Sequence, residues 1–268
     1  VESCPTDNKE KSMSLLHSFY CWGHVLVVLL STLFFVIFGI ENWKYMAIIW
    51  SLVPLLNMIS FFFVPLNNLE NNADHAMPLM TLLKNKRFWI FMFMMFCAGA
   101  SEQAVSQWAS TFAEQGLMVS KTIGDLAGPM FFAIMMGIAR LFYGKFGHRI
   151  NLNKFMLYST LLCLSSYVLI AFAPHPLLGL IGCGICGFSV GIMWPGTFSI
   201  ATASIKARTA LFALLAVAGD IGCATGPLLV GLVANKMDFN IAILSAIIFP
   251  IALLVFILFL KNPKKYRN

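Results

Sequence analysis

Charged residues are scarce in this sequence of 268 residues: only 11% are Asp, Glu, Lys or Arg. Soluble domains carry about 25%. The deficit runs along the whole chain and is accompanied by 59% hydrophobic residues and a mean hydropathy of +0.82. A soluble globular domain is therefore excluded. Several long apolar runs, instead of the single short run of a secretory signal peptide, indicate a multi-pass membrane protein.

The sequence also lacks the clusters of side chains on which enzymes and metal sites depend, such as an HExxH pattern or paired acids. Its seven Cys are an odd number, and the one CxxC pair, Cys183 and Cys186, lies in a Gly-rich apolar segment where packing residues are expected. We therefore expect no enzyme activity, no metal and no cofactor. The five His are scattered along the chain as His17, His24, His75, His148 and His175.

Eight apolar runs are long enough for a helix to cross a bilayer, which takes about 20 residues. Closed β-barrels are the other way to satisfy backbone groups in lipid, but these runs are too long and too continuously apolar for barrel strands. The predicted fold is therefore all-α, a multi-pass bundle of eight transmembrane helices. The runs cover residues 14–39, 43–66, 88–114, 122–143, 152–173, 177–204, 209–234 and 239–260.

The distribution of positive charge predicts the orientation of the helices. Most of the 18 Lys and Arg lie in alternate loops, at 84–87, 144–154 and 204–208, and at the two ends of the chain. Because cytoplasmic loops collect Lys and Arg, both ends are predicted to be cytoplasmic in a plasma membrane. The net charge of +7 then reflects topology and contact with the lipid bilayer, and no nucleic-acid partner is expected.

Two helix hairpins, at 21–43 and 217–239, align with each other in spacing and hydropathy. Internal repeats of helix sets are a mark of secondary transporters. On this alignment His24 and Asp220 occupy equivalent mid-helix positions, one in each copy. The repeat places the chain within a longer pattern of helices, of which about the first four are expected to be missing here.

Three stretches resemble one family. GIARLFYGKFGHRINLNK, at 137–154, resembles the loop motif that follows the second and eighth helices of the major facilitator superfamily. The segment GFSVGIMWPGTFSIATASI, at 187–205, is similar to the tenth helix of its fucose-permease-like, sugar–proton symporter branch, and LLHSFYCWGH, at 15–24, to the fifth helix of bacterial members. The loop motif departs from the usual form because Gly147-His148-Arg149 lacks the Asp of the typical Asp-Arg pair.

The resemblance covers the whole chain and implies helices five to twelve of a twelve-helix transporter. Residues 1–66 would be the remainder of the N-terminal half, 67–87 a cytoplasmic linker and 88–268 the C-terminal six-helix half. The implied function is proton-coupled sugar uptake by alternating access, with a small polar solute and a proton or other coupling ion as partners. The alternatives are a transporter or effluxer of another small polar metabolite, or a non-transporting sensor with a degenerate transporter fold.

The run at 88–114 carries the candidate solute site. On a helical wheel its polar residues occupy one half, which should face a wet cavity or protein because lipid cannot hydrate them. Glu102, Gln103 and Gln107 favour the cavity, since two amides one turn apart suit a polyhydroxylated ligand. Trp108 either stacks on a sugar ring or faces another helix. The hydroxyl residues Ser106, Ser110 and Thr111 are expected to join helices.

Three ionisable residues within the spans are candidates for coupling or gating. Asp220 is either a proton carrier or half of a structural ion pair, because a buried charge at mid-span costs ~3 kcal/mol. Arg140 is expected to extend its side chain from the helix end toward the headgroups, with a gating role as the alternative. His24 is either a proton relay or a hydrogen-bonded packing residue. Trp194, beside the bend expected at Pro195, suits a gate or a binding wall.

Overall fold

The computed structural model describes residues 9–64, 78–205 and 208–260, which form helices and turns with no strand among them. Within these ranges eight helical segments are long and apolar enough to cross a membrane. The predicted all-α bundle of eight spanning helices is confirmed, with ends within a few residues of those predicted. The segments are Lys11–Phe38, Ile40–Phe61, Lys86–Gly116, Lys121–Phe146, Leu152–Phe172, Pro176–Ser204, Ala210–Ala234 and Phe239–Leu260.

Four of the spans contain one α-helix each, without an interruption. Their helices are α1 (Lys9–Phe38), α2 (Trp43–Phe61), α8 (Leu152–Phe172) and α11 (Arg208–Ala234). A 3₁₀ turn, η1 (Ile40–Asn42), joins α1 to α2, so that α2 begins at Trp43 as α12 begins at Phe239. The alignment of the two hairpins places these two helix starts at equivalent positions.

The other four spans are interrupted. Two of the interruptions lie one turn before a proline, Pro195 or Pro250, and a third is a π-helical turn that contains Pro129. A proline has no N–H to donate to the carbonyl four residues earlier. The fourth, at Gln107 and Trp108, has no proline and is followed by a π-helical turn. The pieces are α4 (Lys86–Ser106), α5 (Ala109–Thr111) and η3 (Phe112–Gly116); α6 (Lys121–Asp125), η4 (Leu126–Met130) and α7 (Phe131–Phe146); α9 (Pro176–Val190) and α10 (Met193–Ser204); and α12 (Phe239–Ser245) and α13 (Ile248–Leu260).

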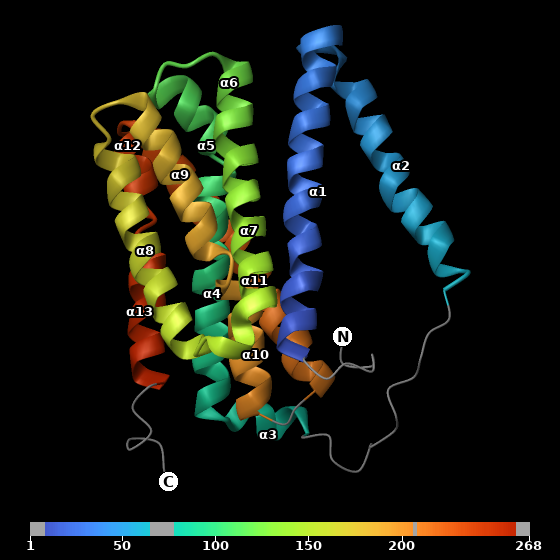
Figure 1. Ribbon diagram of the computed structural model, residues 1–268, viewed down its shortest axis with the longest axis vertical. Helices are drawn as coiled ribbons and strands as arrows, with labels where there is room; N and C mark the ends of the chain where they lie inside the picture. Colours follow the sequence, from blue (N-terminus) through green and yellow to red (C-terminus); the bar gives the residue numbers. More distant parts are fainter. Residues whose placement is uncertain (1–8, 65–77, 206–207, 261–268) are drawn as a thin grey trace.

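The helices from α4 to α13 form one bundle, and α1 lies along its side against α7 (Figure 1). A Cβ added to Gly137 of α7 would lie 3.2 Å from the Cβ of Cys21, so the two helices approach closely. The hydroxyl of Ser14 donates to the Arg140 carbonyl at 2.7 Å. By contrast α2 leans away from the bundle, and Met46 is its one buried residue.

Within the bundle, α4 and α11 are in backbone contact. A Cβ added to Gly222 would collide with the Phe96 carbonyl oxygen, and one added to Gly226 with that of Ala100. Gly99 of α4 likewise leaves no room for a side chain against the α11 backbone. Small residues at such interfaces allow membrane helices to approach closely, which fixes the position of α4 and its polar residues.

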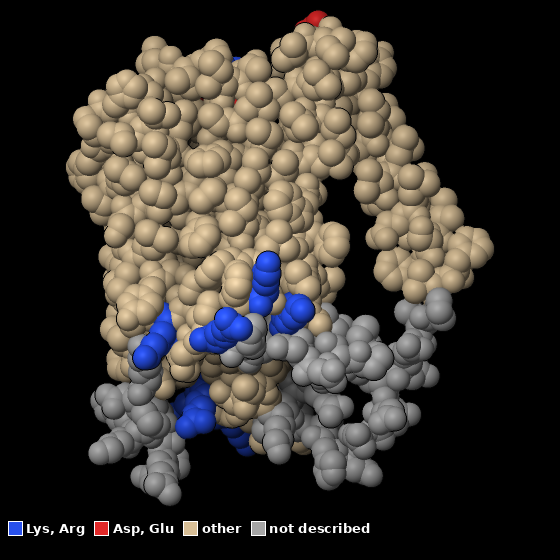
Figure 2. Space-filling view, in the orientation of Figure 1, with Lys and Arg blue, Asp and Glu red and all other residues tan. Residues whose placement is uncertain are grey.

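Lys and Arg gather at one end of the molecule, where the short helix α3 (Leu79–Lys84) lies (Figure 2). The basic stretches 84–87 and 144–154 belong to this end, and the turn η5 (Gly147–Arg149) lies within the second of them. The arrangement agrees with the alternation of basic loops in the sequence. Residues 65–77, which hold most of the predicted linker, and the basic tail at 261–268 lie outside the described residues.

Candidate solute pocket between α1 and α4

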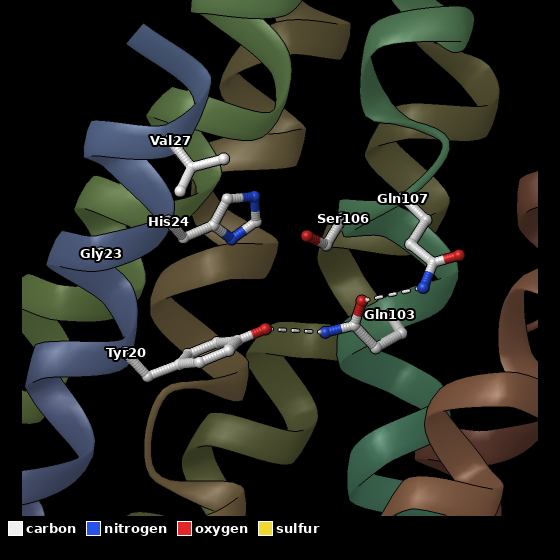
Figure 3. A pocket seen from close by; sticks show the side chains of 7 residues that line it. All are labelled: Tyr20, Gly23, His24, Val27, Gln103, Ser106 and Gln107. Carbon is white, nitrogen blue, oxygen red and sulfur yellow. Dashed lines mark hydrogen bonds between the residues drawn. The ribbon is translucent and has the colours of Figure 1, made fainter. Parts of the chain in front are cut away.

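A pocket of about 530 Å³ lies between α1 and α4 (Figure 3). Pockets that hold small molecules have volumes of about 300–1,000 Å³, and the volume of this one lies within that range. One wall comes from α1 and the other from the end of α4 and the residue that follows it. The lining residues are Tyr20, Gly23, His24, Val27, Gln103, Ser106 and Gln107.

The α4 wall is polar because its residues are spaced three and four apart, which places their side chains on one face of the helix. The Gln107 Nε2 donates to the Gln103 Oε1 at 3.3 Å, and the Gln103 Nε2 donates to the Tyr20 hydroxyl at 3.1 Å. Gln107 is exposed and Gln103 half-buried. Both amides can therefore exchange these long hydrogen bonds for bonds to a solute.

The α1 wall combines an aromatic ring with a titratable one. Tyr20 and His24 lie one helical turn apart, with ring centroids 6.2 Å apart in an edge-to-face arrangement. In Figure 3 the phenol hydroxyl points at Gln103, and the imidazole lies across from Ser106. His24 therefore faces the pocket instead of packing inside the bundle.

Directly behind the pocket lies an ion pair that the sequence did not predict. The Nη2 of Arg140 is 3.4 Å from the Oε2 of Glu102, and the side chains are only 2% and 5% exposed. The expectation that Arg140 extends toward the headgroups is wrong. Its guanidinium turns inward, because the buried carboxylate and two backbone carbonyls satisfy its donors there.

Those carbonyls belong to two further parts of the fold. The Nε of Arg140 donates to Gly191 at 2.9 Å, and Nη1 donates to His17 at 2.7 Å. The ring of Tyr20 lies against the same guanidinium, with its centroid 5.6 Å from Cζ. Arg140, on α7, thus holds together α1, α4 and the break between α9 and α10. The sequence did contain a signal for this pair. Few acidic residues lie within the predicted spans, so a buried arginine there has few possible counterions.

Trp108 faces helix α11 and lies outside the pocket. Its Nε1 donates to the Pro227 carbonyl at 2.9 Å, and its ring packs edge-to-face on Phe239 with centroids 5.5 Å apart. The single helical wheel applies only as far as Gln107, where α4 is interrupted. Beyond the interruption Ser110 donates to the Asp125 carboxylate, so its expected role of joining helices is confirmed.

Trp194 and Asp220 also lie outside the lining of the pocket. Trp194 packs on α11, where a Cβ added to Gly219 would be 2.5 Å from its ring. Its Nε1 is buried and has no hydrogen-bond partner among the described residues. Asp220 is exposed on α11, and no ion pair or hydrogen bond joins it to the part of the chain that the structure describes.

Comparison with known proteins gives the same fold. The sequence profile of the Major Facilitator Superfamily matches residues 1–227 and, in a second overlapping match, residues 131–268. Among solved structures, the chain is similar to a crystal structure of a Major Facilitator Superfamily transporter, FucP, in the outward conformation. The TM-score is 0.62 at 15% sequence identity, over 82% of this chain and 55% of that one. The chain thus spans about half the length of this solved relative. No curated protein sequence matches it.

Proposed function

Because the chain belongs to the Major Facilitator Superfamily, we propose that it takes up a sugar together with a proton across the plasma membrane by alternating access. The observation that carries the proposal is the pair of amides, Gln103 and Gln107, in the pocket between α1 and α4. Each amide offers both donors and an acceptor, which match the hydroxyl groups of a sugar. Secondary transporters bind their solutes near the bilayer midplane between their repeats.

In this proposal the eight spans correspond to helices five to twelve of a twelve-helix transporter. Residues 1–66 belong to the N-terminal half, 67–87 to a cytoplasmic linker and 88–268 to the C-terminal half. The position of α1 at the side of the bundle, with α2 leaning away from it, supports this division. The gathering of Lys and Arg at one end of the bundle supports a cytoplasmic location for that end. Both ends of the chain are assigned to the cytoplasm with it, because α1 begins and α13 ends there (Figure 1).

Within the pocket, Gln103 and Gln107 bind solute hydroxyls and the Tyr20 ring bounds the site from α1. Glu102 lies behind them, and in the empty pocket the Gln103 Nε2 also donates to its Oε1 at 3.3 Å. The two tryptophans, Trp108 and Trp194, pack against α11 in this assignment and make no contact with the solute.

His24 and Asp220 are the proposed coupling residues. His24 lines the pocket, and its imidazole is the side chain whose ordinary titration lies nearest to physiological pH. Asp220 is an exposed mid-span carboxylate, and in membrane helices such groups mark cavities and proton paths. The repeated hairpins place the two at equivalent positions in the two halves, as expected for residues that serve one path.

The proposal is tested by counterflow of a panel of labelled sugars in proteoliposomes containing the full-length protein. We expect one sugar to exchange, and Gln107→Ala to abolish the exchange. Asn235→Ala, in the exposed turn after α11, is the matched control and should exchange normally. If no sugar exchanges, the sugar assignment is overturned and a transporter of another polar solute remains. If Gln103→Ala and Gln107→Ala both exchange normally, the solute binds elsewhere.

A further inference from the structure

The break between α9 and α10 leaves a carbonyl without its usual partner. In a continuous helix the Gly191 carbonyl would accept a hydrogen bond from the amide of residue 195, but residue 195 is proline and has no N–H. The Nε of Arg140 donates to the Gly191 carbonyl instead, at 2.9 Å. A charged donor forms a stronger hydrogen bond than an amide, so Arg140 holds the bend in its observed geometry from a different helix.

The same guanidinium is connected to the solute pocket. Successive contacts run from Gln107 to Gln103 at 3.3 Å, from Gln103 to Glu102 at 3.3 Å, and from Glu102 to Arg140 at 3.4 Å. Each link is a long hydrogen bond or ion pair, and the last joins two side chains that are almost fully buried. A change at Gln103 can therefore reach the bend through one carboxylate and one guanidinium.

The bend itself contains a group that favours rearrangement. Trp194, in the first turn of α10, has a buried Nε1 with no hydrogen-bond partner in the described ranges. A buried donor without a partner disfavours the arrangement that contains it. Gly191 has no room for a side chain, because a Cβ there would lie 2.8 Å from Ala139 Cβ and 2.9 Å from the Met136 carbonyl. The bend is thus closely packed at Gly191, while the Nε1 of Trp194 lacks a hydrogen-bond partner.

We propose that Arg140 is a positioning residue that couples the pocket to the bend between α9 and α10. A solute hydroxyl that binds the Gln103 amide displaces its bond to Glu102. The freed Glu102 carboxylate then draws the guanidinium toward α4, which weakens the bond from Nε to the Gly191 carbonyl and loosens the bend. The role of the solute rests on the proposed function, but the coupling belongs to the empty protein as well.

The coupling is measured without solute, by hydrogen–deuterium exchange of the full-length protein in detergent. Gln103→Leu removes the bond to Glu102 as an occupant would, so the amides of residues 191–194 should exchange about fivefold faster or more. Gln115→Leu, the same change at an exposed position of the same span, is the matched control, with an expected change below about twofold. The amides of α8 and α13 report on global loosening. The proposal is overturned if Gln103→Leu leaves the bend unchanged or speeds α8 and α13 equally.

A second pair of variants tests the contact with the bend directly. Arg140→Lys keeps the positive charge beside Glu102 but removes the Nε donor, and should speed exchange at residues 191–194. Pro195→Ala in the same chain supplies an amide for the Gly191 carbonyl and should bring exchange back to within about twofold of wild type. Pro227→Ala, which supplies an amide in α11 instead, should give no rescue. Rescue by both alanine variants, or by neither, contradicts the proposal.

These results separate the two proposals. If the wild-type protein exchanges no sugar in counterflow but its variants show the expected amide hydrogen exchange, the proposed solute is overturned and the coupling is kept. If a sugar exchanges in counterflow and the exchange depends on Gln107, the solute is kept. If Gln103→Leu then leaves amide hydrogen exchange at the bend unchanged, the coupling is overturned.

Discussion

Arg140 and Glu102 form an ion pair within the bundle, with Nη2 and Oε2 3.4 Å apart and neither side chain more than 5% exposed. The two residues come from different helices, and both also bind groups outside the pair. Removal of one member of such a pair leaves the other buried and charged without a counterion. The pair therefore makes each member sensitive to substitution of its partner.

Arg140→Met should lower the free energy of unfolding by about 3–5 kcal/mol, because it leaves Glu102 buried and unpaired. Glu102→Gln should lower it less, since the amide still accepts a hydrogen bond from Arg140. Thermal unfolding in detergent measures both. Lys154→Met, at an exposed position in the first turn of α8, is the control and should change stability by less than about 0.5 kcal/mol. Equal stability of all three variants would contradict the inward position of Arg140.

Gly222→Ala should destabilise the protein by about 1–3 kcal/mol, because the added Cβ collides with the Phe96 carbonyl and must push α11 away from α4. Gly23→Ala is the matched control in α1, where an added Cβ meets nothing within 4 Å. There alanine should stabilise the helix by about 0.5–1 kcal/mol. The measurement is the same thermal unfolding, and opposite signs for the two variants are required.

Trp108→Phe should lower stability by about 1 kcal/mol, because it removes the bond from Nε1 to the Pro227 carbonyl and keeps the ring on Phe239. Trp89→Phe removes the same kind of bond, to the Leu83 carbonyl, at a position that is 46% exposed. Trp89→Phe should lower stability by less than about 0.5 kcal/mol. A larger effect of Trp108→Phe on sugar affinity than that of Gln107→Ala would return Trp108 to the solute site.

Asp220→Asn should leave thermal stability unchanged, since no ion pair or hydrogen bond among the described residues involves its carboxylate. Proton-driven uptake should fall by about tenfold or more if the carboxylate carries the proton. Counterflow, which moves no net proton, should stay within about threefold of wild type. The control is Asp238→Asn, the same change in the exposed turn before α12. Parallel loss of uptake and counterflow would instead assign Asp220 to solute binding or to the solute path.

The sequence predicted the eight spans well because crossing a bilayer depends only on a local run of apolar residues. The bend near Trp194 was also predictable, since Pro195 removes a donor at a known position. No such signal marks the interruption at Gln107 and Trp108. The wheel correctly placed Gln103 and Gln107 on the pocket, wrongly included Glu102, which is buried in the ion pair with Arg140, and left the direction of Trp108 open.

Contacts between helices were harder to predict. Whether Arg140 faces lipid headgroups or Glu102 depends on how α7 and α4 are rotated about their axes, and packing along the whole helix sets that rotation. The position of Arg140 near the end of its span favoured the headgroups, and this interpretation was wrong. The packing of the Trp108 indole on α11 likewise depends on the close approach of Gly226 to the Ala100 carbonyl. A pattern within a single helix contains no information on such an approach.

The backbone contact between α4 and α11 has a mechanical consequence. With the Phe96 carbonyl seated against Gly222, neither helix can slide or roll past the other without separating, so the pair behaves as one stiff unit. Any movement that widens or narrows the pocket must then come from α1 shifting against that unit. The bond between Tyr20 and Gln103 spans this boundary, and it is the contact within the pocket that such a shift would break first.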